Sequence, residues 1–149
     1  MWITMLSVFL IYNLIILLKY GWLNSISVSY YSLPAKWNFI FTLFCFGYAI
    51  PAVIMAKDGF MFFSGCFICF VGIACNFRQD LITADTHNIC SFIAILLSQL
   101  SILFFYHFWW LNIITVMSTL ILYMLRNKFS QWMYVLEWIA FLTVAYTLK

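Results

Sequence analysis

The chain has 149 residues, of which 67% are hydrophobic and 7% charged, and its net charge is +3. Soluble domains contain roughly half apolar and about a quarter charged residues, so this composition excludes an ordinary water-soluble domain. The few basic residues are scattered and form no stripe, which excludes a nucleic-acid site. We therefore predict one all-α domain over residues 1–149, a polytopic transmembrane helix bundle.

Uncharged runs divide the chain into six predicted membrane spans. A crossing takes about 20 apolar residues, and the stretch 86–125, which has no charge at all, is long enough for two. None of the runs shows the strict polar alternation of barrel strands, so helices are expected. The predicted spans are residues 1–19, 34–56, 59–77, 87–105, 108–126 and 130–148.

The first connection carries alternating serines along residues 24–32. A solvated loop is the preferred interpretation, and the alternative is a short extended or re-entrant piece over the mouth of the bundle. Pro34 suits the first turn of the second helix, and Ser32 is a candidate cap. Pro51 lies inside that helix, where it is expected to cause a kink.

The third and fourth helices each carry a stripe of small or polar residues at helical spacing. Such stripes let helix backbones approach closely, so we predict that these two helices form the centre of the bundle. Close packing alone would explain the stripes. Their members are Gly65, Cys69, Gly72 and Asn76 in the third helix and His87, Ser91, Ala94, Ser98 and Ser101 in the fourth.

The five cysteines are an odd number and fall inside the spans or at their edges, so no disulfide framework is predicted. The Cys66-x-x-Cys69 pair resembles a metal or redox motif. Among Phe and Ile in mid-membrane, however, thiolates are costly, and packing is the preferred interpretation.

The fourth and fifth spans are separated at Tyr106–Trp110, whose aromatic and partly polar residues are typical of a membrane interface. His107 is interpreted there as an interfacial anchor. Basic residues favour one face of the membrane, because the first, third and fifth connections carry five of them. The positive-inside rule makes that face cytoplasmic and puts both termini outside. The five are Lys19, Lys36, Arg78, Arg126 and Lys128, against Lys57 and Lys149 on the other face.

Glu137 lies within the last predicted helix. An acidic residue at mid-span costs about 2.5 to 3.5 kcal/mol, so something should compensate it. We predict that Glu137 faces the bundle interior and contacts His87, Arg78 or Tyr30. An ionisable group inside a membrane is a functional-site candidate, and the alternative is a structural carboxylate bonded to a neighbouring helix.

Other polar residues are expected at the same membrane face. The candidate ligand-binding residues are Ser27, Tyr30, Arg78, Asp80, Asp85, His87 and Glu137. Imidazole and carboxylates suit zinc, but the spacing matches no metal motif, so neither a metal nor another cofactor is predicted. No nucleophile or oxyanion donor can be identified by spacing either.

The run Gly72–Phe77 through Asp80 to His87, with Ser27 and Tyr30-Tyr31, resembles uncharacterised small bacterial multi-pass membrane proteins related to the alkaline ceramidase and progestin/adiponectin receptor superfamily. The resemblance implies a helical bundle in a bacterial cytoplasmic membrane. Its hydrolases bind zinc through several histidines, an aspartate and a serine, for which His87, Asp80 or Asp85, and Ser27 would stand in. The terminal histidine pair of that family has no counterpart here.

Three functions remain open from the sequence. The preferred one is non-enzymatic recognition of a lipid or small ligand, or service to a membrane-protein partner, through the polar pocket. The alternatives are a metal-dependent membrane hydrolase acting on a lipid and a proton- or ion-conducting oligomer that uses Glu137. Membrane lipids are the expected surroundings in each case, and the sequence leaves the oligomeric state open.

Overall fold

The computed structural model describes residues 1–74 and 81–149, and every regular element in those ranges is a helix. The predicted all-α fold is therefore confirmed. In chain order the elements are α1 (Trp2–Tyr20), α2 (Val28–Ser32), the 3-10 helix η1 (Ala35–Trp37), α3 (Phe39–Met55), α4 (Gly59–Ala74), α5 (Leu81–Phe104), α6 (Trp109–Leu125) and α7 (Trp132–Thr147).

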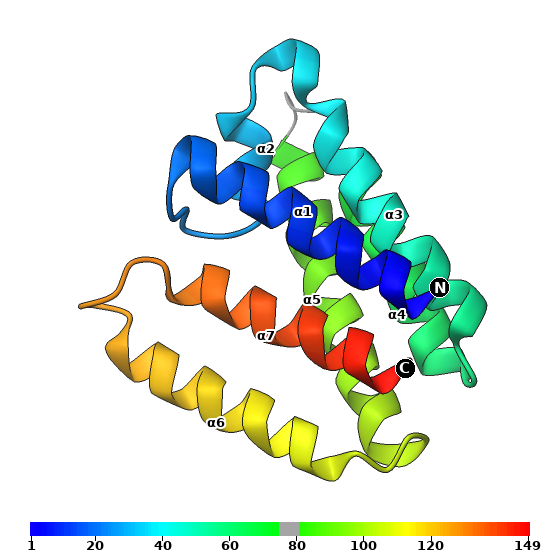
Figure 1. The fold of residues 1–149 in the computed structure, drawn as a ribbon. Coiled ribbons are helices and arrows are strands. Elements are labelled where there is room, and N and C mark those ends of the chain that lie inside the picture. The colour runs from blue at the N-terminus through cyan, green and yellow to red at the C-terminus, as the bar shows by residue number, and fades with distance from the viewer. Residues whose placement is uncertain (75–80) are drawn as a thin grey trace.

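The six long helices form a closed ring in which each helix contacts the next. Contacts join α1 to α3, α3 to α4, α4 to α5, α5 to α6, α6 to α7, and α7 back to α1. α5 also contacts α7 directly, so α6 lies on the outer side of the α5–α7 pair. Figure 1 shows both termini at one end of the bundle, beside the α3–α4 and α5–α6 turns, while the α1–α2 and α6–α7 connections lie at the other.

The first connection differs from its sequence-based prediction. Ser29 and Ser32 lie in the short helix α2, residues 24–32 form no extended piece, and α3 begins at Phe39, five residues later than predicted. Pro34 precedes a single 3-10 turn, in which the Trp37 N–H donates to the Pro34 carbonyl at 2.7 Å. Ser32 does not cap α3, because its hydroxyl donates to the Val28 carbonyl inside α2.

The start of the fourth predicted span also differs. The helix α5 begins at Leu81, six residues before the predicted start at His87. Half of residues 81–86 are polar, but none is proline or glycine, so nothing in them ends a helix. The polar residues mark the end of the apolar span, but the helix α5 extends beyond that end to Leu81.

Two helices are long and apolar enough by themselves to cross a membrane, α1 and the part of α5 from Asp85 to Phe104. The other four apolar helices, α3, α4, α6 and α7, have 16 or 17 residues each. Helices thus occupy the six predicted places, but length and composition qualify only two of the described helices as candidate spans.

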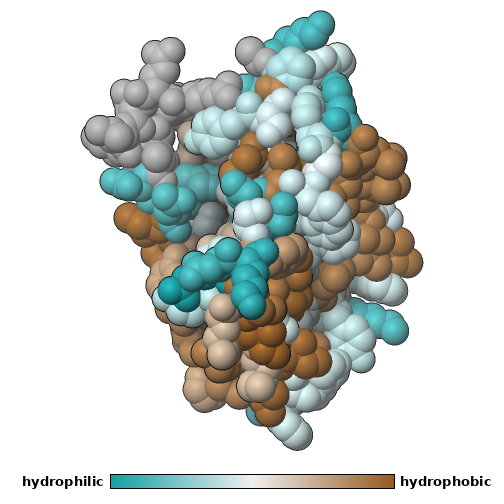
Figure 2. All heavy atoms as spheres, turned by 90° about the vertical axis from the view of Figure 1, so that its left-hand side faces the viewer, coloured by the Kyte–Doolittle hydropathy of each residue, from teal (hydrophilic) through white to brown (hydrophobic). Residues whose placement is uncertain are grey.

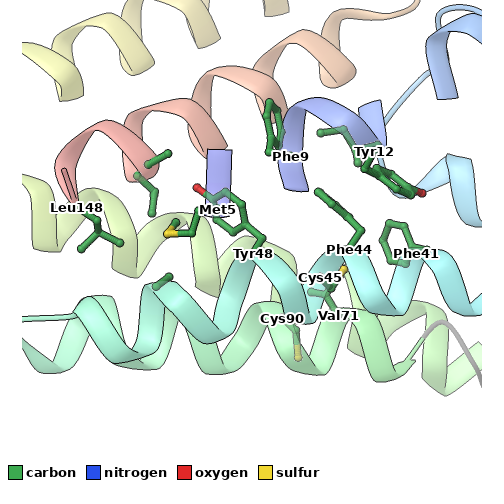
Figure 3. Close-up of a cluster of buried hydrophobic side chains, with 14 of the residues drawn as sticks. Met5, Phe9, Tyr12, Phe41, Phe44, Cys45, Tyr48, Val71, Cys90 and Leu148 are labelled. Atoms are coloured by element: carbon green, nitrogen blue, oxygen red, sulfur yellow. The ribbon is translucent and has the colours of Figure 1, made fainter. Parts of the chain in front are cut away.

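Aromatic side chains fill the core between α1, α3 and α7. The rings of Tyr12 and Phe44 stack with centroids 4.3 Å apart, and Phe9 stacks on Phe141 at 5.4 Å. Figure 3 shows the side chains of α1 and α3 in this cluster, Phe9 and Tyr12 against Phe41 and Phe44. Large aromatic rings therefore fill the space between these three helices.

Small residues bring α4 close to its two neighbours, as the stripes predicted. A Cβ placed on Gly72 would lie 2.7 Å from the Cβ of Cys45 in α3. On the α5 side, the Ser64 hydroxyl donates to the Ala94 carbonyl at 2.7 Å, and Ser98 and Ser101 are buried. The inward direction of the α5 stripe is confirmed at these positions, whereas Asn76 lies outside the described residues.

Asp58 holds the turn between α3 and α4. One of its carboxylate oxygens accepts the N–H groups of Phe60 and Met61, as a helix N-cap does. The other oxygen accepts the Ser101 hydroxyl of α5 at 2.6 Å. The α5–α6 turn lies at the same end, and there His107 adopts a positive φ of 57°.

Candidate functional site

Glu137 points into the bundle from α7, as predicted. Its Oε2 accepts the backbone N–H of Ile26 at 2.5 Å, and the residue lines an internal cavity. This partner is a main-chain group of the first connection. The predicted inward direction is therefore confirmed, whereas the predicted contact to Arg78 lies outside the described residues, and the described bond goes to Ile26 in place of His87 or Tyr30.

The Ile26 N–H is available for this bond because it precedes α2 and has no partner within that short helix. The Ile26 carbonyl is held too, since the Ser29 hydroxyl donates to it. Ser29 also shares a hydrogen bond with the Tyr12 hydroxyl of α1 at 2.5 Å. The first connection is thus fastened to α7 on one side and to α1 on the other.

A second buried polar contact joins α1 to α7, and the sequence analysis missed it. Asn13 is fully buried, and its Oδ1 accepts both the Tyr134 hydroxyl at 2.8 Å and the Trp138 indole N–H at 3.1 Å. Its amide nitrogen donates to the Phe9 carbonyl one turn back. The one signal in the sequence is a single asparagine in the middle of a long apolar run.

The cavity lies among α3, α4, α5 and α7, and Ile26 and Ser27 of the first connection close one end of it. It follows α3 from Phe41 to Ala52, which at 1.5 Å per residue is about 16 Å. Its volume is about 70 Å³. The space is therefore narrow and elongated along the bundle axis.

Apolar side chains and ring edges make up most of the cavity wall. The charged residue among the described lining is Glu137, which lies at the end closed by the first connection. Hydroxyl groups are spaced along the wall, and the polar lining residues besides Glu137 are Ser27, Ser64, Ser91, Ser98 and Tyr48. An apolar tube with a carboxyl group near one end is the resulting arrangement.

Two of the seven candidate ligand-binding residues line the cavity, Ser27 and Glu137. Tyr30 is buried in the core with its ring 6.0 Å from that of Phe41. His87 is half-buried, and its ring lies 6.4 Å from that of Phe41. Tyr30 and His87 therefore lie beside Phe41, whereas Ser27 and Glu137 reach the cavity.

Of the other three candidates, Asp85 alone is among the described residues. Asp85 is exposed on the first turns of α5, so it does not contribute to the cavity. Arg78 and Asp80 fall outside the described residues. In the ranges 1–74 and 81–149, no three His, Cys, Asp or Glu side chains come close enough to hold a metal ion together. Cys45, Cys66, Cys69 and Cys90 form no disulfide among the described residues.

Comparisons with family models, with curated proteins and with solved structures find no match to this chain. The resemblance to the ceramidase and adiponectin-receptor superfamily accordingly stays a prediction. The described part of the chain is thus a bundle of six apolar helices, four of which enclose a narrow cavity that Glu137 lines.

Proposed function

We propose that this chain is a multi-pass membrane protein whose six long helices cross the bilayer, and that its cavity binds the chain of a single-chain amphiphile. The observation that carries the proposal is the narrow, mostly apolar cavity with Glu137 near one end.

Exposed apolar side chains support six spans. Soluble monomers rarely expose apolar patches larger than a few hundred Å². Here large apolar residues are exposed on each long helix, with Leu18 of α1 79% exposed and Met124 of α6 80% exposed. In α6 only Leu111 and Thr115 are buried. Lipid tails are the surroundings in which such surfaces are stable.

The lengths of the shorter helices are compatible with crossing. A helix of 16 or 17 residues is about 24 to 26 Å long, a few Å less than the roughly 30 Å hydrocarbon core. Flanking aromatic residues and local bilayer thinning accommodate a mismatch of that size at modest cost. The four shorter helices can therefore span without being extended.

Charge supports one orientation of this bundle. The described basic residues at the end that carries the α1–α2 and α6–α7 connections are Lys19, Lys36, Arg126 and Lys128, against Lys57 and Lys149 at the other end. Figure 2 looks onto the first of these ends and shows hydrophilic side chains across it. By the positive-inside rule this end is cytoplasmic, in a bacterial cytoplasmic membrane.

We expect single cysteines at positions 2 and 149, in a background without the native cysteines, to react with an impermeant maleimide added from outside. Both termini should label equally, because six spans return the chain to its starting side. Intact and permeabilised cells provide the control. Labelling of the two positions from opposite sides would show an odd number of spans, and labelling of both only after permeabilisation would invert the orientation.

The shape of the cavity selects the ligand. Its volume of about 70 Å³ is less than half the roughly 150 Å³ of an engineered apolar cavity that binds benzene. A sterol or a two-chain phospholipid would have to separate the helices. An unbranched alkyl chain also exceeds 70 Å³, but it widens the space least, because it is only one methylene group wide and the lining follows α3 for about 16 Å.

Filling the cavity tests this proposal. A photoactivatable dodecanol should crosslink to α3 and α4 in the purified protein, and Ala94→Leu, which places three more carbons in the cavity wall, should abolish that crosslink. Because the added atoms occupy empty space, the variant should keep its thermal stability or gain some.

Ala56→Leu is the matched control, since Ala56 packs against the core but does not line the cavity. It should leave the crosslink unchanged. Crosslinking only to exposed positions such as Leu43, with Ala94→Leu having no effect, would show that the probe binds the lipid-facing surface and would overturn the proposal.

A further inference from the structure

The inference concerns the polar end of the ligand and rests on the proposed function. One oxygen of Glu137 is bonded to the Ile26 N–H, and the other, Oε1, has no hydrogen-bond partner in residues 1–74 and 81–149. The residue also lines the cavity. Among the described residues, Oε1 is therefore an open acceptor in the wall of an apolar cavity.

No described basic side chain balances the charge of this carboxyl group. The basic residues at the same end, Lys19, Lys36, Arg126 and Lys128, are all exposed and none lines the cavity. A single backbone N–H leaves an ionised carboxylate incompletely compensated in apolar surroundings. A cationic group on the ligand would supply the missing partner.

We propose that the ligand carries a primary ammonium group, which binds Glu137 while its alkyl chain lies along α3 and α4 in the cavity. An ammonium group has three donors, so it can bond Oε1 of Glu137 and still donate to a neighbouring hydroxyl such as that of Ser27. An anionic head group would meet the carboxylate with no cation in the described lining to offset it.

The one-ended arrangement of the cavity supports the same assignment. Glu137 and Ser27 lie at the end closed by the first connection, whereas Ala52 and Met61 mark the opposite end. A ligand with one polar and one apolar end therefore has a single favourable direction of binding. The bond from Ile26 to Glu137 keeps the first connection over the polar end.

The experiment compares two competitors of equal chain length. Dodecylamine and dodecanol are titrated against the photoactivatable dodecanol, with the wild-type protein in nanodiscs of zwitterionic phosphatidylcholine. A charge-assisted hydrogen bond gives the amine an advantage of about tenfold to a hundredfold in the concentration needed for displacement. This comparison depends on no variant.

Glu137→Gln then assigns the advantage to one group. It keeps the size of the side chain and its acceptor for the Ile26 N–H but removes the charge, so dodecylamine and dodecanol should become nearly equal competitors. Asp85→Asn is the control, because it removes a negative charge from an exposed site at the same end of the bundle. This variant should retain the preference for the amine.

The outcomes separate the inference from the function on which it rests. If the probe labels the cavity but the two competitors are equal in the wild-type protein, the ammonium assignment is wrong and the alkyl-chain site stands. If Asp85→Asn removes the preference as fully as Glu137→Gln, surface charge attracts the amine and the assignment is again wrong. If the probe does not label the cavity, both proposals fail.

Discussion

Replacing Gly72 with leucine is expected to destabilise the bundle by about 2 to 3 kcal/mol, the upper part of the usual range for overpacking. The Cβ alone would lie 2.7 Å from the Cβ of Cys45 and 3.6 Å from the Cα of Thr42. Neither atom is the free end of a flexible side chain, so the α3 and α4 backbones must separate. That separation would also break the bond from the Thr42 hydroxyl to the Gly72 carbonyl, now 2.9 Å long.

Thermal unfolding of the purified protein in a mild detergent measures this effect, with expression level as a second readout. Gly59→Leu is the matched control, because a Cβ at Gly59 meets nothing within 4 Å and the same side chain should be tolerated there. A Gly72→Leu protein as stable as the parent would mean that α3 and α4 do not approach each other in this way.

A double substitution identifies the contact itself. Gly72→Ala adds only the clashing Cβ, and Cys45→Gly removes the atom that it meets. The double variant should therefore be more stable than the sum of the two single losses predicts, by about 1 kcal/mol. Strict additivity would place the cost of Gly72→Ala somewhere other than the α3–α4 contact.

The positions of the helices could be predicted because the cost of a charge in an apolar environment leaves long uncharged runs. The ends of the helices could not be read in the same way. Residues 81–86 form the start of α5 although half of them are polar, and residues 35–37 lie outside α3 although they follow a proline suited to a helix start. Hydropathy indicates whether a segment lies in apolar surroundings, whereas backbone hydrogen bonding determines where its helix begins.

The same distinction applies to the site. Glu137 was expected to face inward because a carboxylate in lipid lacks hydrogen-bond donors, and it does. Its partner could not be predicted, because every residue type except proline has a backbone N–H. The Ile26 N–H is available to Glu137 only because α2 begins after it. The cavity itself results from how four helix faces fit together, which no single stripe of the sequence determines.

Asn13→Leu is expected to destabilise the protein by about 1 to 3 kcal/mol, although it makes α1 more apolar. Leucine fills a similar volume but leaves the Tyr134 hydroxyl and the Trp138 indole N–H without the oxygen that accepts both. An unpaired buried donor costs about 1 to 3 kcal/mol in soluble proteins, and interhelical bonds in membranes average about 0.6 kcal/mol each. Loss of both bonds at the membrane average gives the lower end of the expected range, and one fully unpaired buried donor gives the upper end.

Thermal unfolding in detergent measures this loss as well, and Leu14→Ala on the exposed side of the same helix should change stability by less than about 0.5 kcal/mol. Tyr134→Phe removes one of the two donors, so adding it to Asn13→Leu should cost less than it does in the parent protein. Equal costs of Tyr134→Phe in both backgrounds would show that the Asn13 to Tyr134 bond contributes nothing. A more stable Asn13→Leu protein would show that α1 and α7 are held together by their aromatic packing alone.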